Sequence, residues 1–311
     1  MARKATDAQS TLLKGFIFAI PLLAGFVAME CGLRRVVTRA SHARARIEAQ
    51  QGRCQVLVLG ASNAKDGIAV EALGEPAVNL ADDAQSLYYD LALAEQYVPR
   101  MPKLKVVILP LTYVTFETEG YDWEGWTSWS DYADYWNIPS QKASFFEAQR
   151  WSLTARYGVR MSISYARKKF RVNLEKSARK VLNAEENAAA AARLAKDHGK
   201  AIHPERAGDN LARLDRLTAL VQHDGATLVL VEMPTQENYL RLLSRSVKDR
   251  NRDNRLKFLQ RHPNVIYRDY VHDGRFGGSD FRDPVHLNPQ GAEKFSKILD
   301  AEVVPLVQSR P

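Results

Sequence analysis

A serine, an aspartate and a histidine of this chain have the types and the order in sequence to form a nucleophilic catalytic site. Ser62 follows four apolar residues and a glycine, in Val-Leu-Val-Leu-Gly-Ala-Ser, and Asp283 and His286 form an Asp-x-x-His motif near the other end of the chain. A serine hydroxyl is a weak nucleophile until a base takes its proton, and an imidazole oriented by a carboxylate is such a base. The sequence therefore predicts a triad in which Ser62 attacks, His286 accepts the proton and Asp283 orients the imidazole.

Each motif also has a structural interpretation. Ser62 could cap the N-terminus of a helix or contact a phosphate group, because both roles suit a hydroxyl that follows a strand and a glycine. Asp283 and His286 could be ordinary polar loop residues before a last helix that Asn288 caps and Pro289 starts. The occurrence of both motifs at the two ends of one α/β pattern favours the catalytic interpretation.

Short apolar runs that alternate with helical segments place these motifs in a fold. The predicted strands lie near residues 55–59, 77–80, 105–109, 227–232 and 265–267, and the predicted helices near residues 34–51, 84–98, 206–223, 237–261 and 289–308. This alternation predicts an α/β fold, a three-layer α/β/α sandwich around a five-stranded, mainly parallel sheet. Sites in such sheets lie at the carboxyl ends of the strands, where Ser62 and the loop of Asp283 and His286 fall.

The two motifs resemble those of the SGNH, or GDSL-like, hydrolase superfamily, whose nucleophile follows the first strand and whose Asp-x-x-His precedes the C-terminal helix. The resemblance covers about residues 54–308. The segments at residues 60–68 and 283–292 look most like the membrane-anchored branch, which includes the D-alanyl transfer protein of lipoteichoic acid synthesis and the alginate-type O-acetylation proteins. The resemblance implies an enzyme that works outside the cytoplasmic membrane, beside a membrane-bound O-acyltransferase partner.

This resemblance implies an acyltransferase that moves an acyl group, acetyl above all, through an acyl-serine intermediate to a cell-envelope polysaccharide. Two alternatives stay open. One is an SGNH-type carbohydrate esterase, and the other is a weakly catalytic subunit that binds the glycan within an O-acylation complex. A soluble, cytoplasmic, lipase-like enzyme is a third interpretation, which requires that the apolar N-terminal run is not an anchor.

The oxyanion hole departs from the superfamily's pattern. Soluble members use the serine N–H, a glycine after the second strand and an asparagine after the third, whereas here the second strand runs into Ala81 and Asp82 and the third into Pro-Leu-Thr112. The loss of one donor can cost about 10²–10³ in rate. We expect backbone N–H groups near Ala81 and Asp82, or Asn63 or Thr112, to take this role. Asp83 precedes a predicted helix, so we assign Asp82 and Asp83 to capping.

The positive charge of the chain lies near its N-terminus. Residues 1–53 hold nine Lys or Arg against three Asp or Glu, which leaves only +2 of the formal net charge of +8 for the rest. Without a basic stripe or a recognisable motif in the globular part, we exclude nucleic acid as a partner. The apolar run within residues 11–33 has about the length that a helix needs to cross ~30 Å of lipid bilayer, and no cleavage site follows it, so it predicts an uncleaved transmembrane helix.

These features predict three parts of the chain. Residues 1–33 are the N-terminal region with the anchor, residues 34–53 a basic juxtamembrane linker and residues 54–311 the catalytic domain. The arginines after the anchor would place this domain in the cytoplasm by the positive-inside rule. The resemblance implies the opposite orientation, a single-pass protein of the inner (cytoplasmic) membrane with a periplasmic or extracellular catalytic domain. We follow it because long domains can be translocated despite flanking charge.

The α/β pattern is interrupted at about residues 112–203. The first part mixes carboxylates with aromatic residues, among them Trp123 and Trp126, which suits sugar rings, the membrane interface, a protein partner or a small satellite core. We expect Trp123 and Trp126 to bind substrate. The second part, residues 167–200, is charged, rich in alanine and predicted to be helical. His198 and the other scattered histidines are interpreted as surface residues, and without a metal-binding spacing or a Gly-rich nucleotide loop we expect neither metal nor cofactor.

Overall fold

A computed structural model describes residues 2–34, 39–122, 129–139, 152, 154–155, 182–303 and 305. The chain divides into two compact units, one of Met1–Arg39 with Gln141–Leu174 and one of Ala40–Ser140 with Glu175–Pro311. Ser62 and the Asp-x-x-His motif both belong to the second unit, so the geometry of the candidate site depends on that unit alone.

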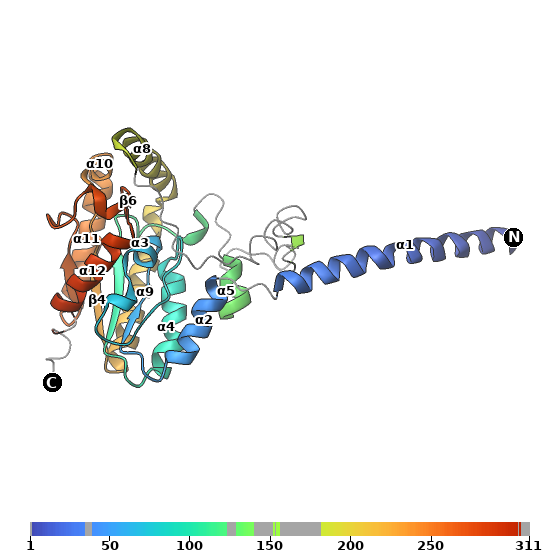
Figure 1. The fold of residues 1–311 in the computed structure, drawn as a ribbon, viewed down its shortest axis with the longest axis horizontal. Coiled ribbons are helices and arrows are strands. Elements are labelled where there is room, and N and C mark those ends of the chain that lie inside the picture. Colours follow the sequence, from blue (N-terminus) through green and yellow to red (C-terminus); the bar gives the residue numbers. More distant parts are fainter. Residues whose placement is uncertain are drawn as a thin grey trace. The chain divides into compact units, whose positions relative to one another are not determined.

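The second unit is built around a five-stranded parallel sheet (Figure 1). The strand order is β2-β1-β3-β4-β5, and the strands are β1 (Val56–Val58), β2 (Ala77–Asn79), β3 (Val106–Leu111), β4 (Thr227–Glu232) and β5 (Ile266–Asp269). Val56 of the central β1 pairs with Ala77 of β2 and with Val106 of β3. A separate antiparallel pair, β6 (Phe281–Asp283) with β7 (His286–Leu287), lies in the segment that was predicted as a loop. The predicted α/β fold with five parallel strands is confirmed.

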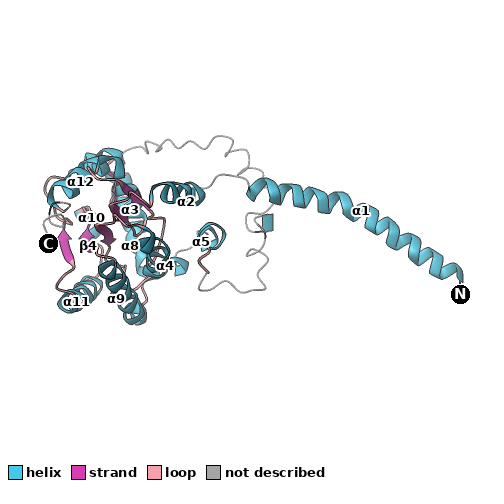
Figure 2. Ribbon diagram, turned by 90° about the horizontal axis from the view of Figure 1, so that it is seen from below, coloured by secondary structure: helices cyan, strands magenta, loops and turns pink. Residues whose placement is uncertain are grey.

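Helices pack on both faces of this sheet, as Figure 2 shows for α12 on one side and α9 and α11 on the other. The α-helices are α2 (Arg39–Gln50), α3 (Ser62–Gly67), α4 (Leu87–Tyr97), α5 (Trp129–Trp136), α8 (Ala184–Ala201), α9 (Ala207–His223), α10 (Glu237–Leu240), α11 (Arg245–Arg261) and α12 (Pro289–Glu302). Single 3-10 turns are η1 (Val70–Ala72), η2 (Val98–Arg100), η3 (Gly120–Asp122), η4 (Pro204–Arg206) and η5 (Gly278–Asp280).

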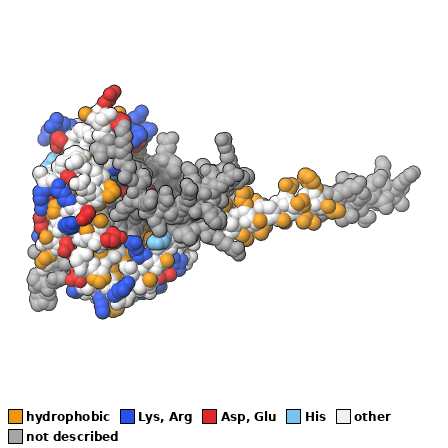
Figure 3. Space-filling model, in the orientation of Figure 1, with side chains coloured by type: hydrophobic (Ala, Val, Ile, Leu, Met, Phe, Trp, Pro, Cys, Tyr) orange, Lys and Arg blue, Asp and Glu red, His pale blue; other side chains and the backbone are white. Residues whose placement is uncertain are grey.

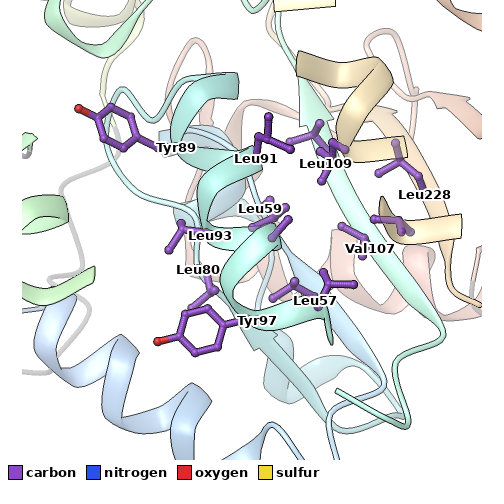
Figure 4. Packing of buried hydrophobic residues seen from close by; sticks show 14 of the residues in the cluster. Leu57, Leu59, Leu80, Tyr89, Leu91, Leu93, Tyr97, Val107, Leu109 and Leu228 are labelled. Carbon is purple, nitrogen blue, oxygen red and sulfur yellow. The ribbon is translucent and has the colours of Figure 1, made fainter. Parts of the chain in front are cut away.

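Alternate residues of the central strands enter two different cores, because successive side chains of a strand point to opposite faces of the sheet. On one face Leu57, Leu59, Val107, Leu109, Leu228 and Leu230 pack with α2, α4, α9 and α11 (Figure 4). On the other face Val56, Val58, Val106, Ile108, Val229 and Val231 pack with α3 and α12. Burial on both faces explains why these strands are apolar at nearly every position. The three layers therefore follow from the strand sequences.

Two predicted helices differ in the structure. The helix predicted over residues 237–261 is interrupted, because the Ser244 side chain accepts a hydrogen bond from Val247 N at 3.3 Å and starts the second helix, α11. The helix predicted from residue 84 begins at Leu87, because Ala84 has a φ of 52°. Asp82 and Asp83 are therefore not its caps, and Asp83 pairs with Lys65 instead.

The N-terminal helix α1 (Ala2–Arg34) belongs to the first unit. Its Glu30 carboxylate accepts hydrogen bonds from Ser152 Oγ at 3.0 Å and from Thr154 N at 3.1 Å. The predicted transmembrane helix at residues 11–33 is not confirmed. No helix in the described part of the chain is long and apolar enough to cross a membrane. Much of the segment predicted as a juxtamembrane linker is α2, whose Ile47 is fully buried in the first core.

Candidate active site

Ser62 is the first residue of α3 and stands at the carboxyl edge of the sheet. The chain leaves β1 at Val58 and turns through Gly60, whose φ of +112° lies in the region that side chains with a Cβ rarely adopt. A Cβ at Gly60 would also lie 3.3 Å from Ala64 Cβ and 3.4 Å from Pro110 Cδ. The glycine therefore allows the sharp turn that brings the Ser62 hydroxyl out of the sheet.

A buried hydrogen-bond network fixes this turn. Gly60 N donates to Asp90 Oδ1 at 2.7 Å, Gln85 Nε2 donates to the same oxygen at 2.6 Å, and Tyr132 OH donates to Gln85 Oε1 at 2.6 Å. Burial raises the pKa of Asp90 to about 7, although the hydrogen bonds from Gln85 and Gly60 oppose that shift. The Asp90 carboxyl group therefore binds the backbone of the nucleophile's turn, and its hydrogen-bond donors are uncharged.

The other end of α3 is held by Asn79, the last residue of β2. Asn79 Nδ2 donates to Ala64 O at 3.0 Å and to Ile68 O at 3.1 Å. Ala64 O also accepts the last backbone bond of the helix, from Ile68 N at 3.1 Å, so Asn79 binds the chain where α3 ends. The helix that carries Ser62 is therefore tied to the sheet at both ends.

The short β6–β7 pair, here called the catalytic hairpin, presents the base. Asp283 Oδ1 accepts hydrogen bonds from Val285 N and His286 N, both at 3.1 Å, and these close the turn between the two strands. Behind the hairpin, Asn288 Nδ2 donates to Ser279 O at 2.6 Å while Asn288 Oδ1 caps α12. Asn288 is thus an N-cap, as its structural interpretation predicted, and the same motif still positions the imidazole.

The structure brings Ser62, His286 and Asp283 together in one hydrogen-bond chain. Ser62 Oγ lies 2.7 Å from His286 Nε2, and His286 Nδ1 lies 2.8 Å from Asp283 Oδ1 and 2.9 Å from Asp283 Oδ2. A carboxylate can only accept, so Nδ1 carries the proton and Nε2 is free to accept the serine hydroxyl proton. This is the arrangement in which a serine becomes a nucleophile.

Electrostatics keep Asp283 ionised. Burial by itself would raise the pKa of the carboxyl, but His286, the Val285 N–H and the Arg282 guanidinium lower it to about 2. An ionised carboxylate holds the imidazole in one tautomer and stabilises the imidazolium that forms when Ser62 gives up its proton.

Several groups predicted for the oxyanion hole are already engaged. Ala81 N donates to Asn79 Oδ1 at 2.9 Å, and Asp82 N donates to Gly60 O at 3.2 Å. The Thr112 hydroxyl lies 3.0 Å from Thr115 Oγ1 in a local turn. Neither backbone N–H is therefore available in this arrangement, because each already has an acceptor.

Asn63 is the remaining predicted candidate among the described residues. It follows Ser62 in α3, it is 7% exposed, and its Oδ1 is buried without a hydrogen-bond partner in the described part of the chain. An amide oxygen only accepts hydrogen bonds, so this atom fits a donor group of a substrate, and only the Asn63 amide NH2 has side-chain protons to give to an oxyanion. Trp123 and Trp126 lie outside the described residues.

The inserted helix α8 supports the catalytic hairpin. Asn187 Nδ2 donates to Gln236 Oε1 at 2.6 Å, and Gln236 N donates to Pro284 O, between the two triad members of the hairpin, at 2.9 Å. His198 of the same helix is half-buried against Tyr239 OH, and burial followed by the charge of His286 lowers its pKa to about 4. The interpretation of His198 as a free surface residue is therefore wrong.

Sequence reasoning missed two further groups. Asp90, behind the nucleophile's turn, was read only as part of a helix, and Arg282, between Asp66 and Asp283, was not singled out. Each acts on a partner distant in sequence, so no local motif marks it. Among the described residues, no group of three or more His, Cys, Asp or Glu side chains could hold a metal ion.

Comparison with known proteins gives limited guidance. No protein-family model matches the chain, and no curated protein matches it. A Streptococcus pneumonia protein provisionally described as a platelet activating factor is similar at 10% identity and a TM-score of 0.42, covering 92% of this chain and 98% of its own. A Bacteroides fragilis protein provisionally described as an acylhydrolase is similar at 10% identity and a TM-score of 0.44, covering 87% and 99%. At such values neither match carries an argument about function.

Proposed function

We propose that the chain is a serine enzyme of acyl transfer, with Ser62 as nucleophile, His286 as general base and acid, and Asp283 as the group that orients the imidazole. The observation that carries the proposal is the unbroken chain from Ser62 Oγ through both nitrogens of His286 to Asp283. A serine that merely starts a helix needs neither a base on its hydroxyl nor a carboxylate behind that base.

The reaction proceeds in two halves. Ser62 Oγ attacks the carbonyl carbon of an ester while His286 Nε2 takes the hydroxyl proton. The bond to the leaving oxygen then breaks, His286 returns the proton to that oxygen, and the acyl group remains on Ser62. In the second half His286 takes a proton from water or from an acceptor hydroxyl, whose oxygen attacks the acyl carbonyl. His286 then returns this proton to Ser62 Oγ as the bond between Ser62 and the acyl group breaks. An esterase uses water and a transferase uses the acceptor.

Within this chemistry we propose the transferase, with acetyl as the acyl group and a cell-envelope polysaccharide as the acceptor. The support is the resemblance of both motif segments to the membrane-anchored O-acylation branch. A membrane-bound O-acyltransferase would then be the partner that delivers the acyl group. A carbohydrate esterase is the alternative, in which water is the acceptor in the second half-reaction.

We also propose that α1 holds the protein at the outer face of the cytoplasmic membrane. The support is a set of large apolar side chains on α1 that are more than half exposed and need a nonpolar cover (Figure 3). They are Ile17, Phe18, Ile20, Leu22 and Leu23.

One observation favours a second candidate, a weakly catalytic glycan-binding subunit. The N–H groups of Ala81 and Asp82 and the Thr112 hydroxyl are engaged elsewhere, so transition-state stabilisation depends on the Ser62 N–H and Asn63. A site with fewer donors is slow.

A labelling experiment tests the nucleophile and its location. A membrane-impermeant fluorophosphonate probe, added to intact spheroplasts, should label the wild-type chain, and Ser62→Ala and His286→Ala should each reduce labelling at least about 10³-fold, because only an activated serine reacts quickly. Ser246→Ala, at an exposed serine of α11, is the matched control and should label normally.

Each failure has its own meaning. Labelling only after lysis would contradict the outer location and leave the nucleophile intact. Folded wild-type protein that is not labelled at Ser62 even after lysis would reject the enzyme and favour the binding subunit. A further assay with a labelled acetyl ester and an added polysaccharide separates the two enzymes. A transferase places the labelled acetyl group on the polysaccharide, whereas an esterase releases it as free acetate.

A further inference from the structure

Arg282 occupies a buried position between two carboxylates of the candidate site. It stands in β6 next to Asp283, and its side chain is only 16% exposed. Arg282 Nη1 donates to Asp66 Oδ2 at 2.7 Å, and Arg282 Nε donates to Asp283 Oδ2 at 3.3 Å. One guanidinium therefore contacts both the triad carboxylate and a residue of the helix that carries the nucleophile.

Asp66 lies one helical turn after Ser62 in α3. Residues four apart share a face of a helix, so the Ser62 hydroxyl and the Asp66 carboxylate both face the catalytic hairpin. Burial would raise the pKa of Asp66, but Lys65, Arg282 and His286 lower it overall, so the carboxylate is charged and the contact with Arg282 is an ion pair.

Two side-chain hydrogen bonds join α3 to the hairpin among the described residues, namely Ser62 with His286 and Asp66 with Arg282. The first is the bond that must break and re-form during catalysis, because the serine proton moves along it. The second stays intact through both half-reactions. Beside the packing of Leu287 against α3, the Arg282–Asp66 pair is therefore the side-chain hydrogen bond that still joins the helix and the hairpin while the acyl-enzyme exists.

Titratable groups from three elements lie near the imidazole. Asp283 lies on β6, Asp66 on α3 and His198, whose pKa burial lowers to about 4, on α8. Lys65, which precedes Asp66, is paired with Asp83. Arg282 contacts both carboxylates and thus places a positive charge between them.

We propose that Arg282, through its pairing with Asp66 and Asp283, is a positioning residue that sets the Ser62–His286 register and offsets the charge of both carboxylates beside the imidazole. This inference rests on the proposed function. Without Arg282 both carboxylates act unopposed near the imidazole, and without the Asp66 charge Arg282 acts more strongly. We therefore expect the two changes to move the pH profile of Ser62 labelling in opposite directions.

The test compares the pH dependence of fluorophosphonate labelling at Ser62 in full-length variants. Arg282→Met should slow labelling about tenfold or more and move the acidic limb of the profile up by about half a pH unit or more, whereas Asp66→Asn should move it down. Arg282→Lys keeps the charge and loses the two-pronged contact, so it should slow labelling with a smaller shift of the limb. Arg275→Met, at an exposed arginine paired with Asp273 and Glu302, is the control.

Opposite shifts for Arg282→Met and Asp66→Asn support the inference, because a purely structural contact would slow both variants without moving their limbs apart. Circular dichroism and thermal melting report whether each variant folds. If Arg282→Met does not fold, the comparison of Arg282→Lys with Asp66→Asn tests the inference in its place. Variants that match Arg275→Met in rate and profile, or that shift in the same direction, overturn the inference alone. Wild-type protein without Ser62-dependent labelling overturns the proposed function, and the inference with it.

Discussion

The two halves of the candidate site are held by different forces. The turn that carries Ser62 is fixed by backbone geometry and by hydrogen bonds that involve no cation. Asp90 accepts from Gly60 N and from Gln85, and Asn79 donates to Ala64 O. The catalytic hairpin has ion pairs in addition to the neutral hydrogen bonds from Asn288 and Gln236. Arg282 pairs with Asp66 and Asp283, and Lys294 pairs with Asp280 at 3.0 Å.

This difference follows from where each half lies. The nucleophile's turn directly follows β1, an inner strand of a sheet that is buried on both faces, where an unpaired charge would be costly and uncharged bonds suffice. The hairpin is outside the main sheet, and Asp283 and Arg282 keep 20% and 16% of their side-chain surface. These side chains can stay charged because they are paired and partly hydrated. Small steric changes should therefore damage the turn, and changes in packing or charge should damage the hairpin.

The strongest way to break the hairpin without touching a charge is Gly291→Ala. A Cβ at Gly291, in the first turn of α12, would lie 2.1 Å from the carbonyl oxygen of Asp280, so α12 and the hairpin must move apart. We expect the free energy of unfolding to fall by about 3 kcal/mol or more, measured by urea denaturation, and Ser62 labelling to fall with it. Gly199→Ala in α8, where a Cβ meets nothing within 4 Å, is the control and should not destabilise the protein. Equal stability of the two variants would show that the hairpin yields easily.

The contrast also explains what the sequence could predict. The strands β1, β3 and β4 are continuous apolar runs, so their positions and the parallel character of the sheet follow from local sequence, whereas the strand order does not. Ser62 and the Asp-x-x-His motif are compact signals at the ends of such elements, and the structure brings them within hydrogen-bond distance.

The supporting contacts could not be predicted in this way. Arg282 and Asp66 are 216 positions apart, and each looks like an ordinary charged residue in its own segment. The strands of the catalytic hairpin have three and two residues, too few for a periodic pattern. The break between α10 and α11 depends on one capping side chain, Ser244, inside a strongly charged stretch whose helical propensity hides it.

On the nucleophile side, Gly60→Ala tests whether geometry alone holds Ser62. The φ of +112° is strained for any residue with a Cβ, and Ala64 and Pro110 leave no room to relax. We expect a loss of about 2 kcal/mol in unfolding free energy and at least about a tenfold loss in labelling rate. Gly225→Ala, with a φ of +77° and open space around it, carries similar backbone strain far from the site. It should lose stability but keep the labelling rate of the folded protein, and an equal loss of rate in both variants would count against a special role for Gly60.

The smallest expected effect, Asp90→Asn, shows whether the network behind the turn really works without charge. Burial raises the pKa of Asp90 to about 7, well above that of an exposed aspartate, so between about pH 4 and pH 7 the unfolded chain is ionised at this position while the folded chain keeps its proton. The folded state then binds more protons than the unfolded state, and the contribution of Asp90 to stability falls as the pH rises through this window and becomes constant above it. An asparagine oxygen can accept the same bonds from Gly60 N and Gln85 Nε2 without this penalty.

The stability of Asp90→Asn relative to wild type should therefore rise by about 1 kcal/mol between pH 5 and pH 7 in urea denaturation, within the limit of about 1.4 kcal/mol per pH unit. Asp253→Asn, at an exposed aspartate of α11, is the control and should differ from wild type by less than about 0.5 kcal/mol at both pH values. A relative stability that falls with pH would mean that the folded state stabilises the Asp90 carboxylate, and that charge supports both halves of the site.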